Sequence, residues 1–398
     1  MTEELERKLI SMWDDTDRYP SKRAISRALG IPRTTVRRWL SNLIEKGAIS
    51  AERDYAIDEE LVKMLKSQNS SLLRELKKEK AKTLSIIESC KTTISKLNIQ
   101  PVEPAKIFNS RTDMSLHALR SDEHVGEKVV PEQVQTIAEY DIDVYKKRLN
   151  AWVEKILLFK EEDKDNHGLN KLVIIRLGDF VTGFHAYKAQ SFYVDIPVVD
   201  QMMVALELEV NALLTLSQYF NEIESFAVVG NHGATASRNS YHMKDNWDYV
   251  LYHFIKIAMM NQPNFKMYIS ESPHMLVKHG DFNFFYTHGE NMRSVLGLPY
   301  YALDRTFHRI NTLYNMRVHY MCTAHHHTPA VIDNKIIMNG SFVGGTDLSI
   351  NKMSLASLPT QKIFYFEDKH GMNRETDLYL DSPWTLEEDE HGIYTSWK

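Results

Sequence analysis

The chain has 398 residues and a formal net charge of −5, a length that predicts a sizeable catalytic core with an appended module. With 43% hydrophobic and 25% charged residues, the composition excludes wholesale disorder, and the net acidity excludes nucleic-acid binding over the whole surface. Two cysteines are too few for a disulfide framework, and no apolar run is long enough to span a membrane, so we expect a cytoplasmic protein without a membrane partner.

Residues 1–57 predict a helix-turn-helix domain that ends in a short two-stranded wing over 48–57. Helices are expected over 5–13, 21–29 and 34–46, with 30–32 as the turn. Eight basic residues against a single acid lie between positions 18 and 46, although the full chain is acidic. This pattern resembles winged helix-turn-helix DNA binders, whose third helix meets DNA. The side chains expected to contact DNA are Arg33, Thr34, Thr35, Arg37 and Arg38. A helical cap that binds another protein is the alternative.

Residues 58–104 predict a helical linker between the two halves. Lys, Glu, Ser and Leu are frequent there, and Gly and Pro are absent until Pro101, which favours one long helix or a helical hairpin. The Leu/Ile stripe is irregular, so a homo-oligomer formed through the linker and a spacer packed on the protein itself are equally expected. Pro101 and Pro104 end the helical pattern and place a catalytic domain at 105–398.

Beyond residue 104, short apolar strands alternate with helical stretches, which predicts an α/β domain with layered sheets. Helices are expected over 131–160 and 198–220. Strands are expected over 116–120, 172–177, 226–229, 282–287, 320–323 and 335–338.

Five polar motifs each directly follow one of these strands, in a chain that contains 17 His. They are Asp122-Glu123-His124, Gly178-Asp179, Gly230-Asn231-His232-Gly233, His288-Gly289 and His325-His326-His327. Loops at the carboxyl ends of strands converge on one face of an α/β sheet. Imidazoles and carboxylates are ligands for Mn²⁺, Fe²⁺ or Zn²⁺, and a bridging carboxylate suits two ions. The motifs therefore predict a metal site.

The ordered series DEH, GD, GNH, H and HHH resembles the signature of calcineurin-like metallophosphoesterases over roughly residues 116–329. The resemblance implies a four-layer α/β sandwich that hydrolyses phosphoesters with two divalent ions, Mn²⁺ foremost, with Fe²⁺, Zn²⁺ or Mg²⁺ as alternatives. It implies that His232 is the catalytic histidine beside the scissile phosphate. It assigns one metal to Asp122, His124 and His327, the other to Asn231, His288 and His325, and the bridge to Asp179.

The order of domains, with a DNA reader ahead of a phosphoesterase, resembles proteins of bacteriophages and their bacterial hosts. The sequence therefore favours a DNA nuclease that its amino-terminal domain brings to DNA. The alternative is a phosphatase of proteins or small phosphoesters whose helical module recruits a partner. A DNA-binding regulator with a degenerate site is disfavoured because the ligand set is complete. His185, Arg238 and Arg293 follow the motifs and are expected to contact substrate.

Overall fold

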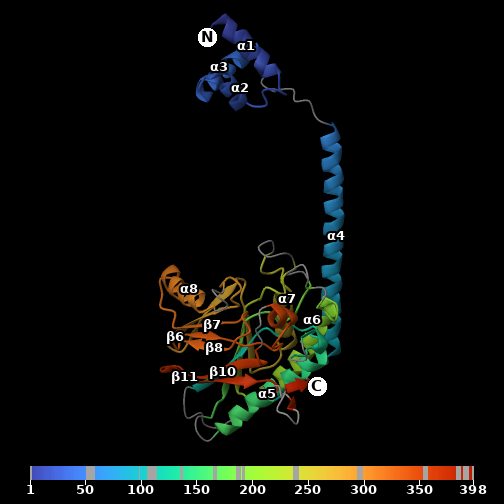
Figure 1. Ribbon diagram of the computed structural model, residues 1–398, viewed down its shortest axis with the longest axis vertical. Helices are drawn as coiled ribbons and strands as arrows, with labels where there is room; N and C mark the ends of the chain where they lie inside the picture. Colours follow the sequence, from blue (N-terminus) through green and yellow to red (C-terminus); the bar gives the residue numbers. More distant parts are fainter. Residues whose placement is uncertain are drawn as a thin grey trace. The chain divides into compact units, whose positions relative to one another are not determined.

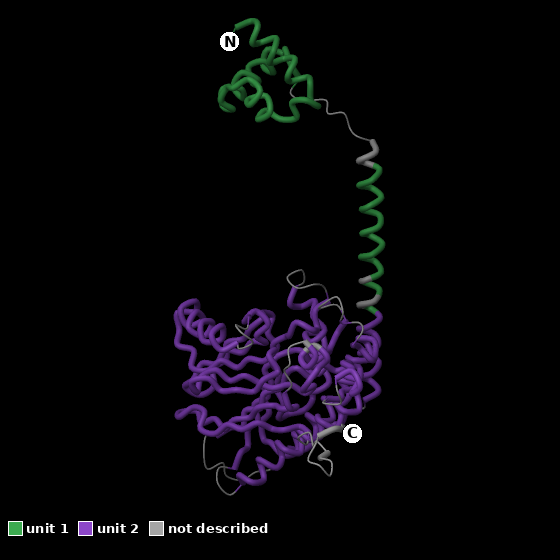
Figure 2. The backbone as a smooth tube through the Cα atoms, viewed as in Figure 1, with its two compact units in different colours: residues 1–84 green, residues 85–398 purple. Residues whose placement is uncertain are grey.

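The computed structural model falls into two compact units, residues 1–84 and 85–398, which Figure 2 colours separately. The division lies inside one long helix that occupies most of the expected linker. No helix in the described part of the chain is long and apolar enough to cross a bilayer. The structure describes residues 2–50, 59–97, 99–104, 114–134, 138–164, 168–184, 190, 193–235, 242–293, 299–352, 357–381, 387–388 and 394–396.

Three short helices form the first unit: α1 (Glu3–Asp14), α2 (Lys22–Leu29) and α3 (Arg33–Glu45). Ser21 caps α2, because its hydroxyl accepts the backbone N–H of Ala24 at 3.2 Å. Gly30 ends α2 at φ +67°, a conformation that favours glycine. The helices share one apolar core, built from Leu9, Ile25, Val36, Leu40 and Leu43. The expected wing lies mainly outside the described residues.

The helix α4 (Glu59–Lys96) is continuous, so of the two forms expected for the linker the chain adopts the single helix. The absence of Gly and Pro explains why nothing interrupts it. Its last turns belong to the second unit, where Ile86 and Cys90 are buried in the core. Earlier along α4, Leu65, Leu72 and Leu76 are each about half exposed.

A six-stranded mixed sheet forms the centre of the second unit, in the order β11-β10-β1-β2-β3-β4. The strands β1 to β4 run parallel, and β10 and β11 extend the sheet in antiparallel fashion. The bounds are β1 (Met114–Arg120), β2 (Lys171–Arg176), β3 (Glu222–Ala227), β4 (Phe265–Ile269), β10 (Thr360–Glu367) and β11 (Gly371–Tyr379).

A second sheet of five strands has the order β5-β6-β7-β9-β8, with β6, β7 and β9 parallel. Its strands are β5 (His274–His279), β6 (Phe282–Thr287), β7 (Tyr320–Thr323), β8 (Ala330–Ile332) and β9 (Ile336–Met338). A short pair, β12 (Glu387–Glu388) and β13 (Tyr394–Ser396), lies apart from both sheets. The remaining elements are η1 (Pro131–Val134), α5 (Ile142–Glu162), α6 (Val198–Ser217), α7 (Trp247–Ala258), α8 (Tyr300–Leu313) and η3 (Leu348–Lys352).

Alternation along the strands sorts the core into layers (Figure 1). On β2, Leu172 and Ile174 pack in the cluster that contains α5, α6 and α7, whereas Val173 and Ile175 pack between the two sheets. On β6, Phe284 faces the first sheet and Phe285 packs with α8. The order is therefore helices, first sheet, second sheet, α8, and the expected α/β class with two sheets and helices is confirmed.

The stretch 131–160, expected as one helix, is divided into the short η1 and the longer α5. Asp141 explains where α5 begins, because its carboxylate accepts the backbone N–H of Val144 at 2.8 Å as an amino-terminal cap. Strands β4, β5, β8, β10 and β11 were not expected from the sequence. The last two belong to the carboxyl-terminal part of the chain, where no motif was recognised.

Candidate metal centre

The loops that follow β1, β2, β3, β6 and β7 bring the seven expected metal ligands into a common region. Three groups of side chains lie close enough for each group to hold one ion, with all ligand atoms within 4.8 Å of one another. The groups are Asp122, His124 and His327; His124, Asp179 and His232; and Asp179, His288 and His325. Asn231 joins the third group through its side-chain oxygen, which lies 3.1 Å from Nε2 of His288.

The backbone is strained at most of these positions. Among the described residues, eight other than glycine have a positive φ, and five of them are expected ligands. Those five are Asp122, His124, Asp179, His325 and His327, with φ between 43° and 69°. The other three are Asn or Asp. Residues in this region cost about 1–3 kcal/mol each and persist where the surrounding structure fixes them, typically at functional sites.

The first group has the spacing of ligands around a single ion. Oδ1 of Asp122 lies 3.2 Å from Nε2 of His327 and 3.9 Å from Nε2 of His124, and the two nitrogens are 3.3 Å apart. A point equidistant from three atoms so placed lies about 2.0 Å from each, the usual length of a bond from imidazole or carboxylate to Zn²⁺. Within the described part of the chain, the buried Oδ1 of Asp122 has no hydrogen-bond donor other than these two imidazoles. The group therefore fits a divalent cation.

The third group gathers several polar atoms around one imidazole nitrogen. Nδ1 of His288 donates to the carbonyl of Leu177 at 2.6 Å. Its Nε2 faces Oδ2 of Asp179 at 3.0 Å, Oδ1 of Asn231 at 3.1 Å and Nδ1 of His325 at 3.2 Å. One nitrogen bears at most one hydrogen and cannot satisfy three such neighbours. A cation among these four atoms would satisfy them together.

The carboxylates give the centre a strong attraction for positive charge. Burial opposes protonation of His288, yet Asp179 and Asp122 outweigh burial and raise its pKa to about 10. Burial likewise opposes ionisation of Asp179, but His288 and His232 hold its pKa well below the usual range. Asp179 belongs to the second and third groups, so it lies between His124, expected to bind one ion, and His288 and His325, expected to bind the other.

His232 lies beside the first group. Its ring meets that of His124 edge to face, with centroids 4.3 Å apart, and its backbone N–H donates to Oδ1 of Asp179 at 2.7 Å. Burial is the main cause that lowers its pKa, although Asp179 opposes this effect. The buried side chain of Gln190 approaches Nδ1 of His232 at 3.5 Å. The imidazole therefore lies at the edge of the centre, in contact with the expected ligand His124 on one side and approached by Gln190 on the other.

Asp248, at the start of α7, was missed by the sequence analysis, although it organises two of the ligand loops. Its Oδ2 accepts the backbone N–H groups of Asp179 at 2.8 Å and Gly230 at 3.0 Å. Its Oδ1 accepts those of Phe180 at 3.0 Å and Val181 at 3.2 Å. Burial and the neighbouring Asp179 raise the pKa of Asp248 to about 7, against the effect of the N–H donors. An acid just inside an amphipathic helix gave no signal of this role.

The two loops that Asp248 joins also touch each other directly. Gly178 has φ +90°, and a Cβ there would lie 2.2 Å from the backbone nitrogen of Gly230. A Cβ on Gly230 would lie 2.1 Å from Oδ1 of Asp179. Asn246 completes the junction, because its amide donates to the carbonyl of Gly230 at 2.7 Å. Both glycines are therefore required by close approach of the backbone.

A buried ion-pair network lies next to the first motif. Arg120 binds Glu123 through two hydrogen bonds, at 3.0 and 2.5 Å, and also contacts Glu209 at 3.1 Å. Arg176 binds the other oxygen of Glu209, and Tyr145 donates to Glu123 at 3.0 Å. All five side chains are buried. Because Glu123 lies between the ligands Asp122 and His124, this network fixes the turn that carries them.

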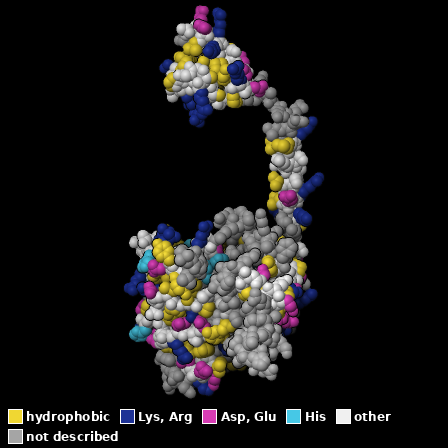
Figure 3. All heavy atoms as spheres, viewed as in Figure 1, with side chains coloured by type: hydrophobic (Ala, Val, Ile, Leu, Met, Phe, Trp, Pro, Cys, Tyr) yellow, Lys and Arg dark blue, Asp and Glu magenta, His cyan; other side chains and the backbone are white. Residues whose placement is uncertain are grey.

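The residues expected to contact DNA lie at the start of α3. Arg33, Thr34, Arg37 and Arg38 are exposed and Thr35 is partly buried. On the face drawn in Figure 3, Lys and Arg side chains project from the first unit at several places. Of the expected substrate contacts, Arg293 is exposed shortly after His288. His185 and Arg238 lie outside the described residues.

Comparison with known proteins gives little further information. No family model matches the chain, and no curated protein matches it. Among solved structures, it is similar to a conserved uncharacterized protein, described as a predicted phosphoesterase, from Streptococcus pneumoniae TIGR4, with 12% identity and a TM-score of 0.26 over 66% of this chain and 98% of that one. Wild-type Vps29 from Entamoeba histolytica, complexed with Zn²⁺, gives 11% identity and a TM-score of 0.25 over 66% and 99%. Scores this low do not establish a common fold, so the case for a metal centre rests on this chain's own geometry.

Proposed function

We propose that the chain is a calcineurin-like, two-metal phosphodiesterase that cleaves DNA, to which its first unit binds. The observation that carries the proposal is the joined set of His and Asp groups, in which Asp179 belongs to two groups and His124 to two. Adjacent cation sites that share a carboxylate suit in-line displacement at phosphorus.

The nitrogen and oxygen donors fit divalent ions of the first transition series. We propose that the centre binds two Mn²⁺ ions, with Fe²⁺, Zn²⁺ or Mg²⁺ as alternatives. Imidazole nitrogens with carboxylate and amide oxygens are ligands that Mn²⁺, Fe²⁺ and Zn²⁺ accept. One ion would be held by Asp122, His124 and His327. The other would be held by Asn231, His288 and His325, with Asp179 shared. When bound, such ions activate water for attack and offset the charge that develops on phosphate oxygens.

Side chains of the protein must supply the proton transfer that the reaction requires. Hydrolysis breaks one P–O bond and forms another to the oxygen of water, and the departing oxygen must gain a proton. We assign that transfer to the imidazole of His232, which is not among the ligands expected for either ion although it forms a close group with His124 and Asp179. The backbone N–H of His232 donates to Asp179, which fixes the position of this residue beside the expected ligands, and imidazole is a common general acid.

Two features favour DNA as the substrate. The first unit carries an excess of basic residues on an acidic chain, and its exposed arginines cluster at the start of α3. The first turn of α3 contains no acid, so the positive end of the helix dipole is not offset there. Both features suit contact with a phosphate backbone.

The test is to incubate purified protein and Mn²⁺ with labelled single-stranded DNA, labelled duplex, bis-p-nitrophenyl phosphate and a chromogenic phosphomonoester. Cleavage of either DNA and of the small diester, abolished by EDTA, is the expected result. Turnover of the monoester alone would overturn the DNA assignment in favour of a phosphatase whose first unit recruits a partner. Absence of turnover on every substrate, with metal bound, would overturn the enzymatic role.

A further inference from the structure

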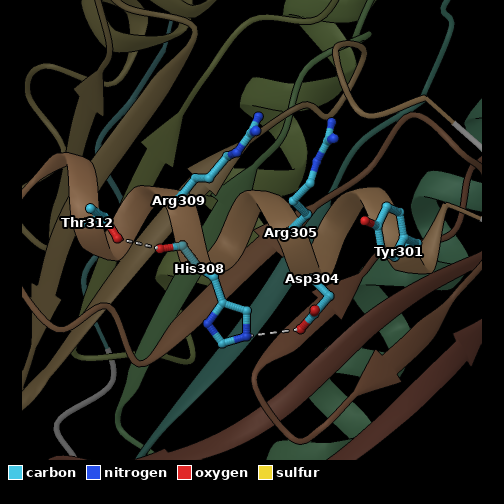
Figure 4. Close-up of a pocket in the computed structure, with 6 residues that line it drawn as sticks. All are labelled: Tyr301, Asp304, Arg305, His308, Arg309 and Thr312. Carbon is cyan, nitrogen blue, oxygen red and sulfur yellow. Dashed lines mark hydrogen bonds and ion pairs between the residues drawn. The ribbon is translucent and has the colours of Figure 1, made fainter.

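The outer face of α8 carries a basic and aromatic surface that the metal centre does not use. Arg305 and Arg309 extend side by side from α8, and Tyr301 lies one turn before Arg305 (Figure 4). The surface lines a shallow hollow of about 350 Å³ together with Asp304, His308 and Thr312. Tyr301 is 67% exposed, which is high for a large aromatic side chain without a partner to cover it.

The positive charge of this surface is available to a ligand. Within the described part of the chain, neither Arg305 nor Arg309 forms an ion pair with a carboxylate. Asp304, which lines the same hollow, pairs instead with His308 at 3.4 Å, and its side chain extends away from the two arginines in Figure 4. The guanidinium of Arg305 lies 6.0 Å from the centre of the Tyr301 ring. Two arginines at i and i+4 are neighbours on a helix, so they can contact successive phosphates.

The chain path brings the start of α8 to the end of the second sheet that carries two of the expected ligands. The strands β6 and β7 run parallel, and each is followed by metal-ligand candidates, His288 and His325. Because α8 connects them, its first turn begins at the same end of the sheet as those ligands. Met292, four residues after the expected ligand His288, belongs to the same buried apolar cluster as Leu303 and Phe307 of α8.

We propose that the outer face of α8 binds single-stranded DNA whose neighbouring nucleotides enter the metal centre. Arg305 and Arg309 contact its phosphates, and Tyr301 stacks on an unpaired base. An aromatic ring beside a basic track is the arrangement by which proteins hold single strands without reading their sequence. The inference rests on the proposed function, to which it adds a substrate form and a path.

The experiment uses the full chain with Arg33, Arg37 and Arg38 replaced by Ala, so that the first unit does not mask binding elsewhere. Into this parent we introduce R305A/R309A, Tyr301→Ala or the control K146A/K147A. Lys146 and Lys147 are exposed on α5, so the control removes the same charge from another helix of the second unit. Affinity for a fluorescent oligothymidine is measured by anisotropy in EDTA across a salt series, and hydrolysis of bis-p-nitrophenyl phosphate is measured with Mn²⁺.

R305A/R309A should weaken binding about tenfold at moderate salt and reduce the logarithmic salt slope by about 1.4, since each single-strand phosphate contact contributes about 0.7. Tyr301→Ala should weaken binding at least fivefold with little change in slope. The control and all small-diester turnover should remain as in the parent. Unchanged affinity in R305A/R309A, or an equal loss in the control, overturns the α8 assignment and leaves the proposed nuclease standing. A wild-type chain that hydrolyses the small diester but neither binds nor cleaves DNA overturns both.

Discussion

Asp248→Asn should disrupt the centre although Asp248 touches it only through backbone groups. Each carboxylate oxygen accepts two N–H groups, at 2.8 and 3.0 Å and at 3.0 and 3.2 Å. An amide nitrogen in place of either oxygen cannot accept these bonds and turns its own donors toward them. Each buried donor left unsatisfied costs about 1–3 kcal/mol, so the two hydrogen bonds lost with one oxygen should lower the free energy of unfolding by about 2–6 kcal/mol. Because the affected loops carry Asp179 and Asn231, metal affinity should fall together with stability.

Two measurements check this reasoning. Chemical denaturation of the metal-free variant gives the loss in free energy of unfolding, and mass spectrometry of protein dialysed against limiting Mn²⁺ gives metal content. The matched control is Asp245→Asn, which removes the same charge from an exposed position three residues earlier. The control should resemble wild type in both. If Asp248→Asn unfolds at the wild-type denaturant concentration and retains full metal content, the carboxylate does not hold the loops and the reasoning is refuted.

Further predictions concern the expected metal ligands, the proposed catalytic histidine and the helices α3 and α4. Asp179→Asn should lower metal content more than His124→Ala, because Asp179 is proposed to be shared by both ions and His124 to hold one; equal metal content in both would contradict the bridge. His232→Ala should keep both metals and lose about 10²- to 10⁴-fold in turnover on a substrate with a poor leaving group, as expected for proton transfer; wild-type turnover would exclude this role. Replacing the three exposed arginines of α3 by Ala should flatten the salt dependence of duplex binding by about 0.9 per lost contact while small-diester hydrolysis persists; unaltered duplex affinity would exclude α3 as the reader. If α4 associates with a second copy, Leu72→Glu should convert a dimer to a monomer in light scattering, whereas a monomeric wild type would exclude that use of the helix.

The parts of the fold that the sequence predicted are those with a strong local pattern. The parallel strands β1 and β2 are almost entirely buried, with an apolar run in β2 and alternate apolar residues in β1, and their expected bounds lie within two residues of the observed ones. Strands β4 and β11 were missed because neither is a continuous apolar run: β4 alternates between buried and exposed residues such as Lys266, and the middle of β11, around Glu375, is exposed. Such edge strands depend on pairing with a distant partner, which a local pattern does not reveal.

The candidate site was predicted from order and spacing, and the structure brings its described residues together. Its supports could not be predicted in the same way. Asp248 lies 69 positions from the N–H of Asp179 that it accepts, and Glu209 lies 89 positions from Arg120. Neither has a short motif, because the contacts are made across the sheet and between loops. Buried charged residues inside apolar strands, such as Arg120 on β1 and Arg176 on β2, were the available signal.

The strained backbone of the ligand loops is stabilised by buried hydrogen bonds from residues outside the ligand set. Five ligand positions adopt a positive φ, and the two Asp among them bury their carboxylates. Each of these features costs free energy of folding, so the chain keeps them only where other contacts fix the loops. Asp248 supplies four hydrogen bonds to the loops after β2 and β3, and the Arg120–Glu123 pair supplies two beside the turn after β1. Metal binding to the folded state alone would add stability in proportion to the logarithm of metal concentration. The ligand loops therefore contain unfavourable features, namely positive φ at residues other than glycine and buried carboxylates. The buried residues whose hydrogen bonds offset this cost lie next to these loops.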